Sequence, residues 1–376
     1  MKILHVTKKY PGALGGDAVV VSNLVKQQKA HDDKVIILTS NCDEIDNGEH
    51  LFKFGLKNTS AGLDNITPKR LVSLAMLVFV AFKVLRAERP DVIHTHATEM
   101  ALAVSFAARH YRIPIVHTFH IVTFYYQQQP MLRRKTELLM AKAAHATLIT
   151  APNRYDVDRL KKAGLTQVQL MPNGIDLEFW KNPSSTRKRS QFTFVTAGRL
   201  EQQKGYEYLI KAAGLLKQTN ENFQVVVIGD GSQKARLYEL ARLSGVLKFI
   251  VFAGRKPADQ IREIYASADA AVFPSLWETT PLTLLEAWAM QLPTIITRVG
   301  ILRGTKVYDN SVILVKRHDQ MSLAKAMSTV LSNGSIRNNL ATSGIQQVQA
   351  FTWDKIYGIA NGLYKDTVVS YTRVSR

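Results

Sequence analysis

Short runs of apolar, mostly β-branched residues alternate with longer stretches in which apolar residues recur at helical spacing. In the first half of the chain the short runs predict strands at 3–7, 35–40, 92–95, 115–119, 147–150 and 168–171. Helical patterns fall between them, at 17–30, 68–88, 98–110, 131–145 and 153–163. Regular alternation of this kind predicts a parallel sheet with helices on both faces.

The second half of the chain repeats the pattern. Its strands are predicted at 192–197, 224–228, 249–252, 270–273, 294–297 and 312–315, and its helices at 204–218, 232–244, 257–267, 281–291 and 319–332. Between the halves lie Pro172-Asn173-Gly174 and the polar run 181–191, which are typical of a break. We therefore expect an α/β protein with two doubly wound, Rossmann-like domains. Their ligand site should be an inter-domain cleft, where the strands of two facing sheets end.

Composition and charge narrow the class of partner. At 376 residues and 46% hydrophobic content, the chain can fill two cores. The net charge is +19, with +11 in residues 1–190 and +8 in 191–376, so the excess is not a basic tail. Phosphorylated ligands, an anionic membrane surface or nucleic acid could each balance it. Because no basic stripe is interleaved with aromatic residues, we expect no nucleic acid.

The compartment and membrane contact are less constrained. Cys42 is the only cysteine, and 1–7 has the pattern of a first strand, not of a signal peptide, so we expect a cytoplasmic protein. The stretch 71–82 is apolar except for Ser73, but it is shorter than the roughly 20 residues that span a bilayer. It is either a buried domain helix or a helix that touches a membrane. In the second case its flanking cations would meet anionic lipid: Lys69, Arg70, Lys83, Arg86 and Arg89.

Two glutamates, Glu278 and Glu286, bracket a turn and the start of an apolar helix. On one regular helix they would lie about 12 Å apart along the axis. Glycosidase carboxyl pairs lie about 5–9.5 Å apart, so a hydrolytic pair is disfavoured. We expect Glu278 on the strand-to-helix loop and Pro281 at the first helical position. Carboxylates there could bind sugar hydroxyls and the helix N–H groups could bind phosphate, unless Glu278 merely caps the helix.

Glycine-containing turns follow two other predicted strands. Gly198 allows a sharp turn, while Arg199 offers a planar donor fork and Lys204 a point charge, which are suited to phosphate unless the stretch is only a solvated basic loop. Gly15-Gly16 follows the first strand and would let backbone N–H groups approach an anion. Neither has the G-x-G-x-x-G spacing of dinucleotide-binding proteins, so redox chemistry is not indicated.

Histidines end several strands of the first half. His120 ends the strand at 115–119 and could contact a sugar hydroxyl or a charged transition state. His117 should point to the opposite face and be structural. His94 and His96 share one strand face, where hydrogen bonding is favoured over metal ligation. Asp156-Val157-Asp158 lies on the expected solvated face of a helix, so we expect no metal site there.

Taken in order, these motifs resemble the retaining GT-B glycosyltransferases of the group that builds lipopolysaccharide, capsule and phosphatidylinositol mannosides. The resemblance covers nearly the whole chain. It rests on Gly15-Gly16, 91–96, 118–120, 172–176, Gly198-Arg199 with Lys204, 229–231, 266–269, Glu278 and Glu286 with seven residues between them, and 351–354.

The resemblance implies a fold and a reaction. It implies two Rossmann-like domains, an acceptor-side domain at 1–172 and a nucleotide-sugar domain at 173–350, with a last helix in 351–376 that crosses back to the first domain. It implies transfer of a sugar from a nucleotide-diphosphate sugar to a lipid-linked or other saccharide acceptor, with retention, without a metal or other cofactor, at the inner face of a membrane. A nucleotide-sugar epimerase or hydrolase of the same fold is the alternative. The oligomeric state is left open.

The resemblance also implies roles for single residues. Arg199 and Lys204 would hold the diphosphate, Glu286 the ribose hydroxyls and Glu278 the donor sugar, while His120 would lie beside the transferred sugar. The catalytic set is therefore His120, Arg199, Lys204 and Glu278. The other donor contacts would come from Gly15, Gly16, Gly198, Gly229, Gly254, Arg255, Thr279, Thr280, Pro281 and Leu282.

Three positions depart from the family pattern. Thr279-Thr280 replaces the usual glycine and hydrophobic residue after the first glutamate. Gln291 replaces a glycine, and 298–301 replaces a Gly-Gly turn that ends in glutamate. The first departure places the identity of the donor sugar in question more than the reaction.

Overall fold

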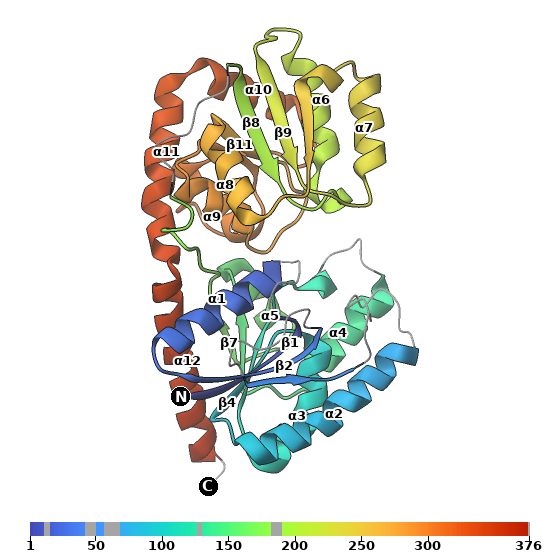
Figure 1. Ribbon diagram of the computed structural model, residues 1–376, viewed down its shortest axis with the longest axis vertical. Coiled ribbons are helices and arrows are strands. Elements are labelled where there is room, and N and C mark those ends of the chain that lie inside the picture. The colour runs from blue at the N-terminus through green and yellow to red at the C-terminus, as the bar shows by residue number, and fades with distance from the viewer. Residues whose placement is uncertain (11–15, 42–49, 56–67, 126–129, 182–189, 375–376) are drawn as a thin grey trace. The chain divides into compact units, whose positions relative to one another are not determined.

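A computed structural model describes residues 1–10, 16–41, 50–55, 68–125, 130–181 and 190–374. The chain forms two compact units (Figure 1). The first unit contains Met1–Gly174 together with the C-terminal segment Trp353–Arg376, and the second contains Ile175–Thr352. Each unit is a parallel α/β layer structure, as the alternating pattern predicts.

The N-terminal unit is built on a seven-stranded parallel sheet with the order β3-β2-β1-β4-β5-β6-β7. Its strands are β1 (Lys2–Lys9), β2 (Lys34–Asn41), β3 (His50–Lys53), β4 (Val92–Thr95), β5 (Ile115–Thr118), β6 (Leu148–Ala151) and β7 (Val168–Leu170). Its helices are α1 (Gly16–Ala30), α2 (Pro68–Glu88), α3 (Thr98–Tyr111), α4 (Met131–Ala143), α5 (Arg154–Lys162) and α12 (Trp353–Val374).

The two faces of this sheet differ in what covers them. Leu4 and Val6 of β1 pack with α2 and α3 through residues such as Leu77 and Val104. His5, between them, points to the other face, because side chains alternate along a strand. There it meets Gln28 of α1 at 2.8 Å. Helix α12 packs beside α1 in Figure 1, so the C-terminal helix is part of the first unit.

The C-terminal unit is built on a six-stranded parallel sheet with the order β10-β9-β8-β11-β12-β13. Its strands are β8 (Phe192–Ala197), β9 (Phe223–Ile228), β10 (Ile250–Gly254), β11 (Ala270–Phe273), β12 (Thr294–Thr297) and β13 (Ile313–Val315). Its helices are α6 (Tyr206–Leu216), α7 (Lys234–Leu243), α8 (Ala258–Ser267), α9 (Leu282–Ala289), α10 (Gln320–Ser332) and α11 (Gly334–Val348). The expected α/β fold class of two Rossmann-like domains is confirmed.

Local departures from the sequence prediction have physical causes. Helix α9 begins at Leu282, so Pro281 precedes the helix instead of occupying its first position. Lys204 ends a short 3-10 turn, Gln202–Lys204, and helix α6 begins two residues later, after Gly205 adopts a left-handed conformation. Gln291 has a φ of 56°, in the left-handed region that favours glycine, which accounts for the glycine usual at that position in the family pattern.

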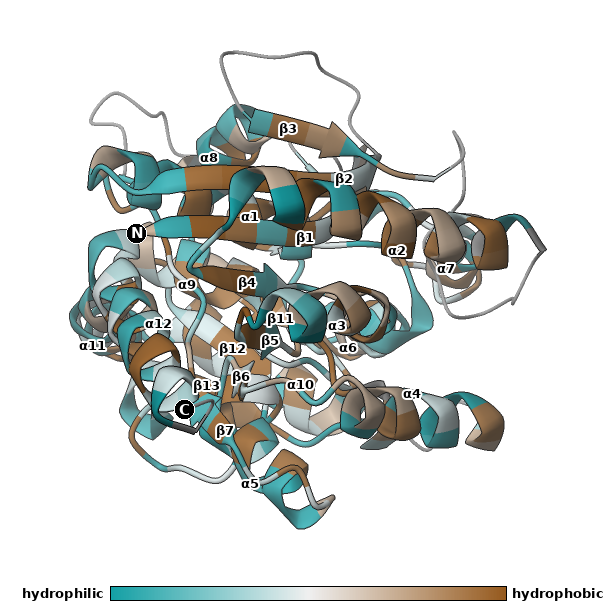
Figure 2. Ribbon diagram, turned by 90° about the horizontal axis from the view of Figure 1, so that it is seen from below, coloured by the Kyte–Doolittle hydropathy of each residue, from teal (hydrophilic) through white to brown (hydrophobic). Residues whose placement is uncertain are grey.

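Helix α2 has one buried face and one exposed face. Leu77, Ala81 and Leu85 are fully buried against the sheet, whereas Leu71 and Phe79 are 58% and 61% exposed. Figure 2 shows hydrophobic colour over most of this helix. Among the described residues, no helix is long and apolar enough to cross a membrane. The stretch is thus a domain helix that leaves an apolar stripe outside.

Candidate active site

The strand orders place the predicted site residues at comparable points of the two sheets. In the C-terminal sheet the chain direction of strand addition reverses between β8 and β11, and in the N-terminal sheet between β1 and β4. In open α/β sheets, loops at the carboxyl ends of such strands bind ligands. The loop after β8 carries Arg199 and Lys204, and the loop after β11 carries Glu278.

Backbone contacts hold the loops after β8 and β9 against each other. Gly198 N–H donates to the Ile228 carbonyl at 3.0 Å, and Leu200 N–H donates to the Asp230 carbonyl at 2.9 Å. Gly229 has a φ of 140°, and a Cβ added there would overlap the Gly198 carbonyl oxygen. Glycine is therefore required at Gly229 by close approach of two backbones. The result is a fixed turn from which Arg199 projects into solvent.

Lys204 and Glu278 form an ion pair between the loops after β8 and β11. Their side chains are only 16% and 11% exposed. Ser275 Oγ donates to the same Glu278 oxygen at 3.1 Å. The carboxylate is thus positioned by an ammonium and a hydroxyl, which are both donors that a phosphate or sugar oxygen could also use.

Glu286 is the fifth residue of α9, and its side chain is half-buried. Burial raises its pKa to about 7, against an ordinary value of 4.5, and the nearby Lys204 charge opposes that rise. The next turn of α9 is anchored by Trp288, which is fully buried and donates to the Ser311 carbonyl at 3.2 Å. Lys204 therefore acts on both glutamates of the pair that brackets the turn.

The residues between the two glutamates lead from the loop after β11 into helix α9. Thr279 is half-buried, while Thr280 and Pro281 are buried and Leu282 opens the helix. Gly300, with a φ of 54°, lies so close that an added Cβ would overlap the Thr279 carbonyl oxygen. Two of the three departures from the family pattern, Thr279-Thr280 and 298–301, are thus in direct backbone contact.

Gly254 ends β10, beside β9 in the sheet, and Arg255 follows it. Gly229 N–H donates to the Gly254 carbonyl at 2.8 Å, so the predicted glycines of these two strand ends meet. Arg255 is exposed. In the N-terminal unit Gly16 begins α1 and is exposed, whereas Gly15 lies outside the described residues.

His120 is the end of a chain of histidines behind the carboxyl edge of the N-terminal sheet. His120 Nε2 lies 3.0 Å from His96 Nδ1, and His96 Nε2 lies 2.9 Å from His5 Nδ1. His94 contacts Tyr364 of α12 and Thr118 of β5, both at 2.7 Å. Burial lowers the pKa of His5 to about 4, and it also lowers the pKa values of His94, His96 and His120. These rings are neutral at pH 7.

His117 points to the opposite face of the sheet, as predicted. Its Nδ1 lies 2.9 Å from Thr95 Oγ1, and its Nε2 lies 3.4 Å from Thr98 Oγ1 at the start of α3. Burial lowers its pKa to about 4. Asn153 caps the start of α5, where its side-chain oxygen accepts from Asp156 N–H at 2.8 Å. Asp156 is buried, so the expectation of a solvated position is wrong for this residue.

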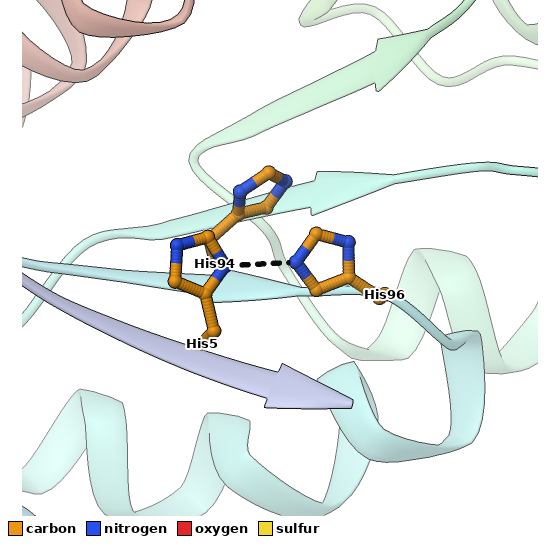
Figure 3. A group of neighbouring side chains, drawn as sticks. All are labelled: His5, His94 and His96. Atoms are coloured by element: carbon orange, nitrogen blue, oxygen red, sulfur yellow. Dashed lines mark hydrogen bonds between the residues drawn. The ribbon is translucent and has the colours of Figure 1, made fainter. Parts of the chain in front are cut away.

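Within the described ranges, His5, His94 and His96 are the group of side chains close enough to share a metal ion (Figure 3). All six of their ring nitrogens already take part in hydrogen bonds within the protein: to Gln28, Tyr364, Thr118, His120 and between His5 and His96. A metal would have to break these bonds. The geometry therefore fits a hydrogen-bonded role for His94 and His96.

Several functional neighbours were not predicted from the sequence. Ser275 has a weak sequence signal, since it lies just after a buried strand, in the loop that carries Glu278. Gln28 looks like any polar residue of an amphipathic helix, although it is completely buried. Tyr364 lies 270 residues from its partner His94, so no local pattern could join them.

Solved structures share this fold. Sucrose-phosphate synthase from Thermosynechococcus elongatus is 20% identical with a TM-score of 0.84, over 98% of this chain and 100% of that chain. Anabaena HepE in complex with UDP and glucose is 17% identical with a TM-score of 0.79, over 97% and 100%. These likenesses extend through both units of the chain.

Curated relatives are also sugar-transferring enzymes by name. The glycogen synthase of Mycobacterium tuberculosis (strain H37Rv) is 26% identical over 279 residues, which are 72% of this chain and 67% of the relative. The D-inositol 3-phosphate glycosyltransferase of Acidothermus cellulolyticus is 27% identical over 345 residues, or 83% and 76%.

Family models match each unit. One described as Glycosyltransferase Family 4 matches residues 14–179, and one described as Glycosyl transferases group 1 matches residues 178–347. The two matches meet near the boundary between the units and together run from 14 to 347. With both Rossmann-like units in place, the chain belongs to the glycosyl transferases group 1 family of the GT-B fold.

Proposed function

We propose that this protein is a retaining glycosyltransferase that moves a sugar from a nucleotide-diphosphate sugar to a saccharide acceptor without a metal ion. The observation that carries the proposal is the Lys204–Glu278 ion pair, which joins the loops at the switch point of the C-terminal sheet. A cation and a carboxylate in contact are suited to a donor that carries both phosphate and hydroxyl groups. The UDP bound by the structural relative HepE supports this choice of donor class.

The chemistry follows from the charges. When the glycosidic bond breaks, negative charge grows on the departing diphosphate, and Arg199 and Lys204 would stabilise it. A planar guanidinium on an exposed turn and a half-buried ammonium are complementary for this task. Glu278, released from Lys204 by the phosphates, would accept hydrogen bonds from hydroxyls of the donor sugar. Glu286 would hold the ribose. The acceptor would attack from the face that the diphosphate leaves.

Replacement of Lys204 by alanine tests the proposal. We expect Lys204→Ala to fold normally and to lose transfer by about 100-fold or more, since one charge-stabilising group typically contributes about 3 kcal/mol to such a step. The matched control is Lys211→Ala, which removes an exposed lysine from α6 of the same unit. Transfer is measured with a panel of UDP- and GDP-sugars chosen by thermal shift. Wild-type turnover of Lys204→Ala would refute the phosphate site.

The product distinguishes transfer from the alternative reactions. Free sugar in the absence of acceptor product would indicate a hydrolase, and an altered sugar still attached to nucleotide would indicate an epimerase. The anomeric configuration of the product, read from its proton coupling constants, tests retention. Activity that survives chelation tests the independence from metal.

We further propose that the acceptor is lipid-linked and that α2 brings the protein to an anionic membrane surface. The apolar stripe Leu71, Val72, Met76 and Phe79 is exposed on this helix. Lys83 lies over the Phe79 ring at 4.4 Å, so a cation borders the stripe. An apolar face beside basic residues is typical of helices that lie in a membrane interface.

Vesicle binding tests this contact. Phe79→Ser should reduce sedimentation with phosphatidylglycerol vesicles, while Leu243→Ser, which changes an even more exposed apolar residue of α7, should not. Neither change should reduce transfer to a soluble acceptor. Equal binding of both variants would exclude α2 as the membrane contact.

A further inference from the structure

The chain leaves strand β13 through a short basic segment, residues 316–318, which contacts two elements of the candidate site. Arg317 Nη1 donates to the Leu276 carbonyl, in the loop after β11, at 3.1 Å. His318 Nδ1 lies 2.7 Å from the hydroxyl of Tyr208 in α6, and the two rings meet edge to face with their centroids 5.2 Å apart. One segment therefore holds both the loop after β11 and the helix that follows the loop after β8.

His318 has a backbone conformation that residues with side chains seldom adopt. Its φ is 61°, in the left-handed region, where a residue other than glycine is uncommon and strained. Such strain persists only where the surrounding structure fixes it, and it is concentrated at functional positions. At this position the side chain contacts Tyr208, a contact that glycine could not make. The strain thus points to a role for the imidazole ring.

Leu276 connects the segment 316–318 to the ion pair of the candidate site. Its carbonyl accepts from Arg317, and its N–H donates to the Gln203 carbonyl at 2.8 Å. Gln203 directly precedes Lys204, and Leu276 stands two residues before Glu278. Because both backbone groups of Leu276 are bonded, the loop after β11 is held between the loop after β8 and the segment after β13.

The start of α6 is fixed in the same region. A Cβ added at Gly205 would overlap the Pro274 carbonyl oxygen, so the two loops also touch at this point. Tyr208 N–H donates to the Gly205 carbonyl at 2.9 Å, which places Tyr208 one turn after Lys204. By holding the Tyr208 hydroxyl, His318 therefore restrains the turn that carries Lys204.

We propose that Arg317 and His318 are positioning residues for the reaction, which fix the two loops of the ion pair before a donor binds. Each acts on the pair through one intermediate residue and not by touching the donor. When the donor phosphates separate Lys204 from Glu278, both side chains then move from a fixed backbone. A misplacement of about 1 Å can slow a reaction about 100-fold. The effect on transfer rests on the proposed function, whereas the restraint of the two loops does not.

Hydrogen exchange of the full-length protein without ligand reads the restraint directly. Arg317→Met keeps an unbranched stem and removes the donor, so we expect amides in 274–281 to exchange roughly 10-fold faster. Arg317→Lys retains a donor and should restore part of the protection. Lys316→Met removes the exposed cation at the preceding position and is the matched control. Unchanged exchange over 274–281 in Arg317→Met would overturn the proposal.

Two variants test the contact between His318 and α6. His318→Gly removes the ring and suits the left-handed backbone, so this variant should fold. Tyr208→Phe removes only the hydroxyl. Both should speed exchange over 204–209, whereas Tyr238→Phe, which makes the same change at a half-exposed tyrosine of α7, should not. Wild-type exchange over 204–209 in His318→Gly would overturn the role of His318.

Kinetics distinguish positioning from direct contact with the donor. Where transfer is measurable, Arg317→Met should lower kcat about 10-fold, Arg317→Lys should recover much of it, and affinity for the free nucleoside diphosphate should stay unchanged. Weaker nucleotide binding with normal exchange in the ligand-free protein would show that Arg317 binds the donor itself, and would overturn the proposal. The expected exchange in a wild-type protein that transfers no sugar would refute the proposed function and leave the restraint of the loops standing.

Discussion

Glu286 should make the stability of the C-terminal unit fall as the pH rises. Its pKa in the folded protein is about 7, raised from 4.5 by burial. Between these two values the folded state holds a proton that the unfolded state has lost, so each pH unit reduces the free energy of unfolding. Below pH 4.5 both states are protonated, and above pH 7 the carboxylate is charged in both. The loss is therefore confined to the window from about pH 4.5 to about pH 7.

The size of this effect follows from the pKa difference. One pKa unit corresponds to about 1.4 kcal/mol, so the rise to about 7 gives an upper limit of about 3 kcal/mol. Glu286→Gln stays neutral at every pH and removes this contribution. Relative to the wild type, the variant should gain about 2–3 kcal/mol in the free energy of unfolding between pH 5 and pH 8. Urea unfolding at four pH values, followed by tryptophan fluorescence, measures the difference.

The control and the refuting result are specific to burial. Glu263→Gln, which makes the same substitution at an exposed glutamate of α8, is the matched control. If the wild type and Glu286→Gln keep parallel pH profiles, burial does not retain the proton on Glu286. Nucleotide-sugar binding supplies a second readout: if the charged carboxylate grips the ribose, wild-type affinity should rise from pH 6 to pH 8 and the variant's should not.

Two further predictions concern backbone conformation in the same protein. Gln291 has a φ of 56°, and a side chain in this left-handed region costs about 1–2 kcal/mol. Gln291→Gly should therefore raise the free energy of unfolding by about 1 kcal/mol, because the greater conformational entropy that glycine loses on folding offsets part of the gain. Urea unfolding measures the gain, and an equal gain in Gln291→Ala would contradict this cause. Gly229→Ala should destabilise by about 3 kcal/mol, since its Cβ would overlap the Gly198 carbonyl oxygen. Gly358→Ala, in an exposed turn of α12 with no heavy atom within 4 Å of the new Cβ, should instead stabilise by about 0.5–1 kcal/mol. Similar effects of the two alanines on the midpoint of thermal unfolding would refute the steric argument.

The hydrophobic pattern predicts most of the sheet because buried parallel strands are continuous apolar runs. The strands Val92–Thr95, Phe192–Ala197, Ala270–Phe273 and Thr294–Thr297 have the bounds that the pattern predicts. The strand His50–Lys53 was missed because it is a four-residue edge strand whose ends are exposed. The helix Gly334–Val348 was missed because Asn, Gln, Ser and Thr fill much of it, and three buried residues fix it in place.

The candidate site is likewise predicted only in part from the sequence. Motif order places Arg199, Lys204 and Glu278 in strand-end loops, and the structure brings Lys204 and Glu278 together. The motifs predict that each of these residues contacts a ligand, and they do not predict that Lys204 and Glu278 contact each other. Lys204 and Glu278 are 74 residues apart in the sequence, so their contact depends on the order of the strands in the sheet. No local sequence pattern predicts that order.

The two units have different polar groups at the point where the strand order of each sheet reverses. At the reversal of the C-terminal sheet, a charged pair is left half-buried at the edge, where a ligand can compete for either partner. At the reversal of the N-terminal sheet, neutral histidines extend from the edge into the core, and Tyr364 closes the line from the last helix. A charged group could not occupy that interior without a large desolvation cost, whereas neutral imidazoles can donate and accept in series. The C-terminal helix therefore contributes a buried hydrogen bond to the interior of the first unit as well as packing against it.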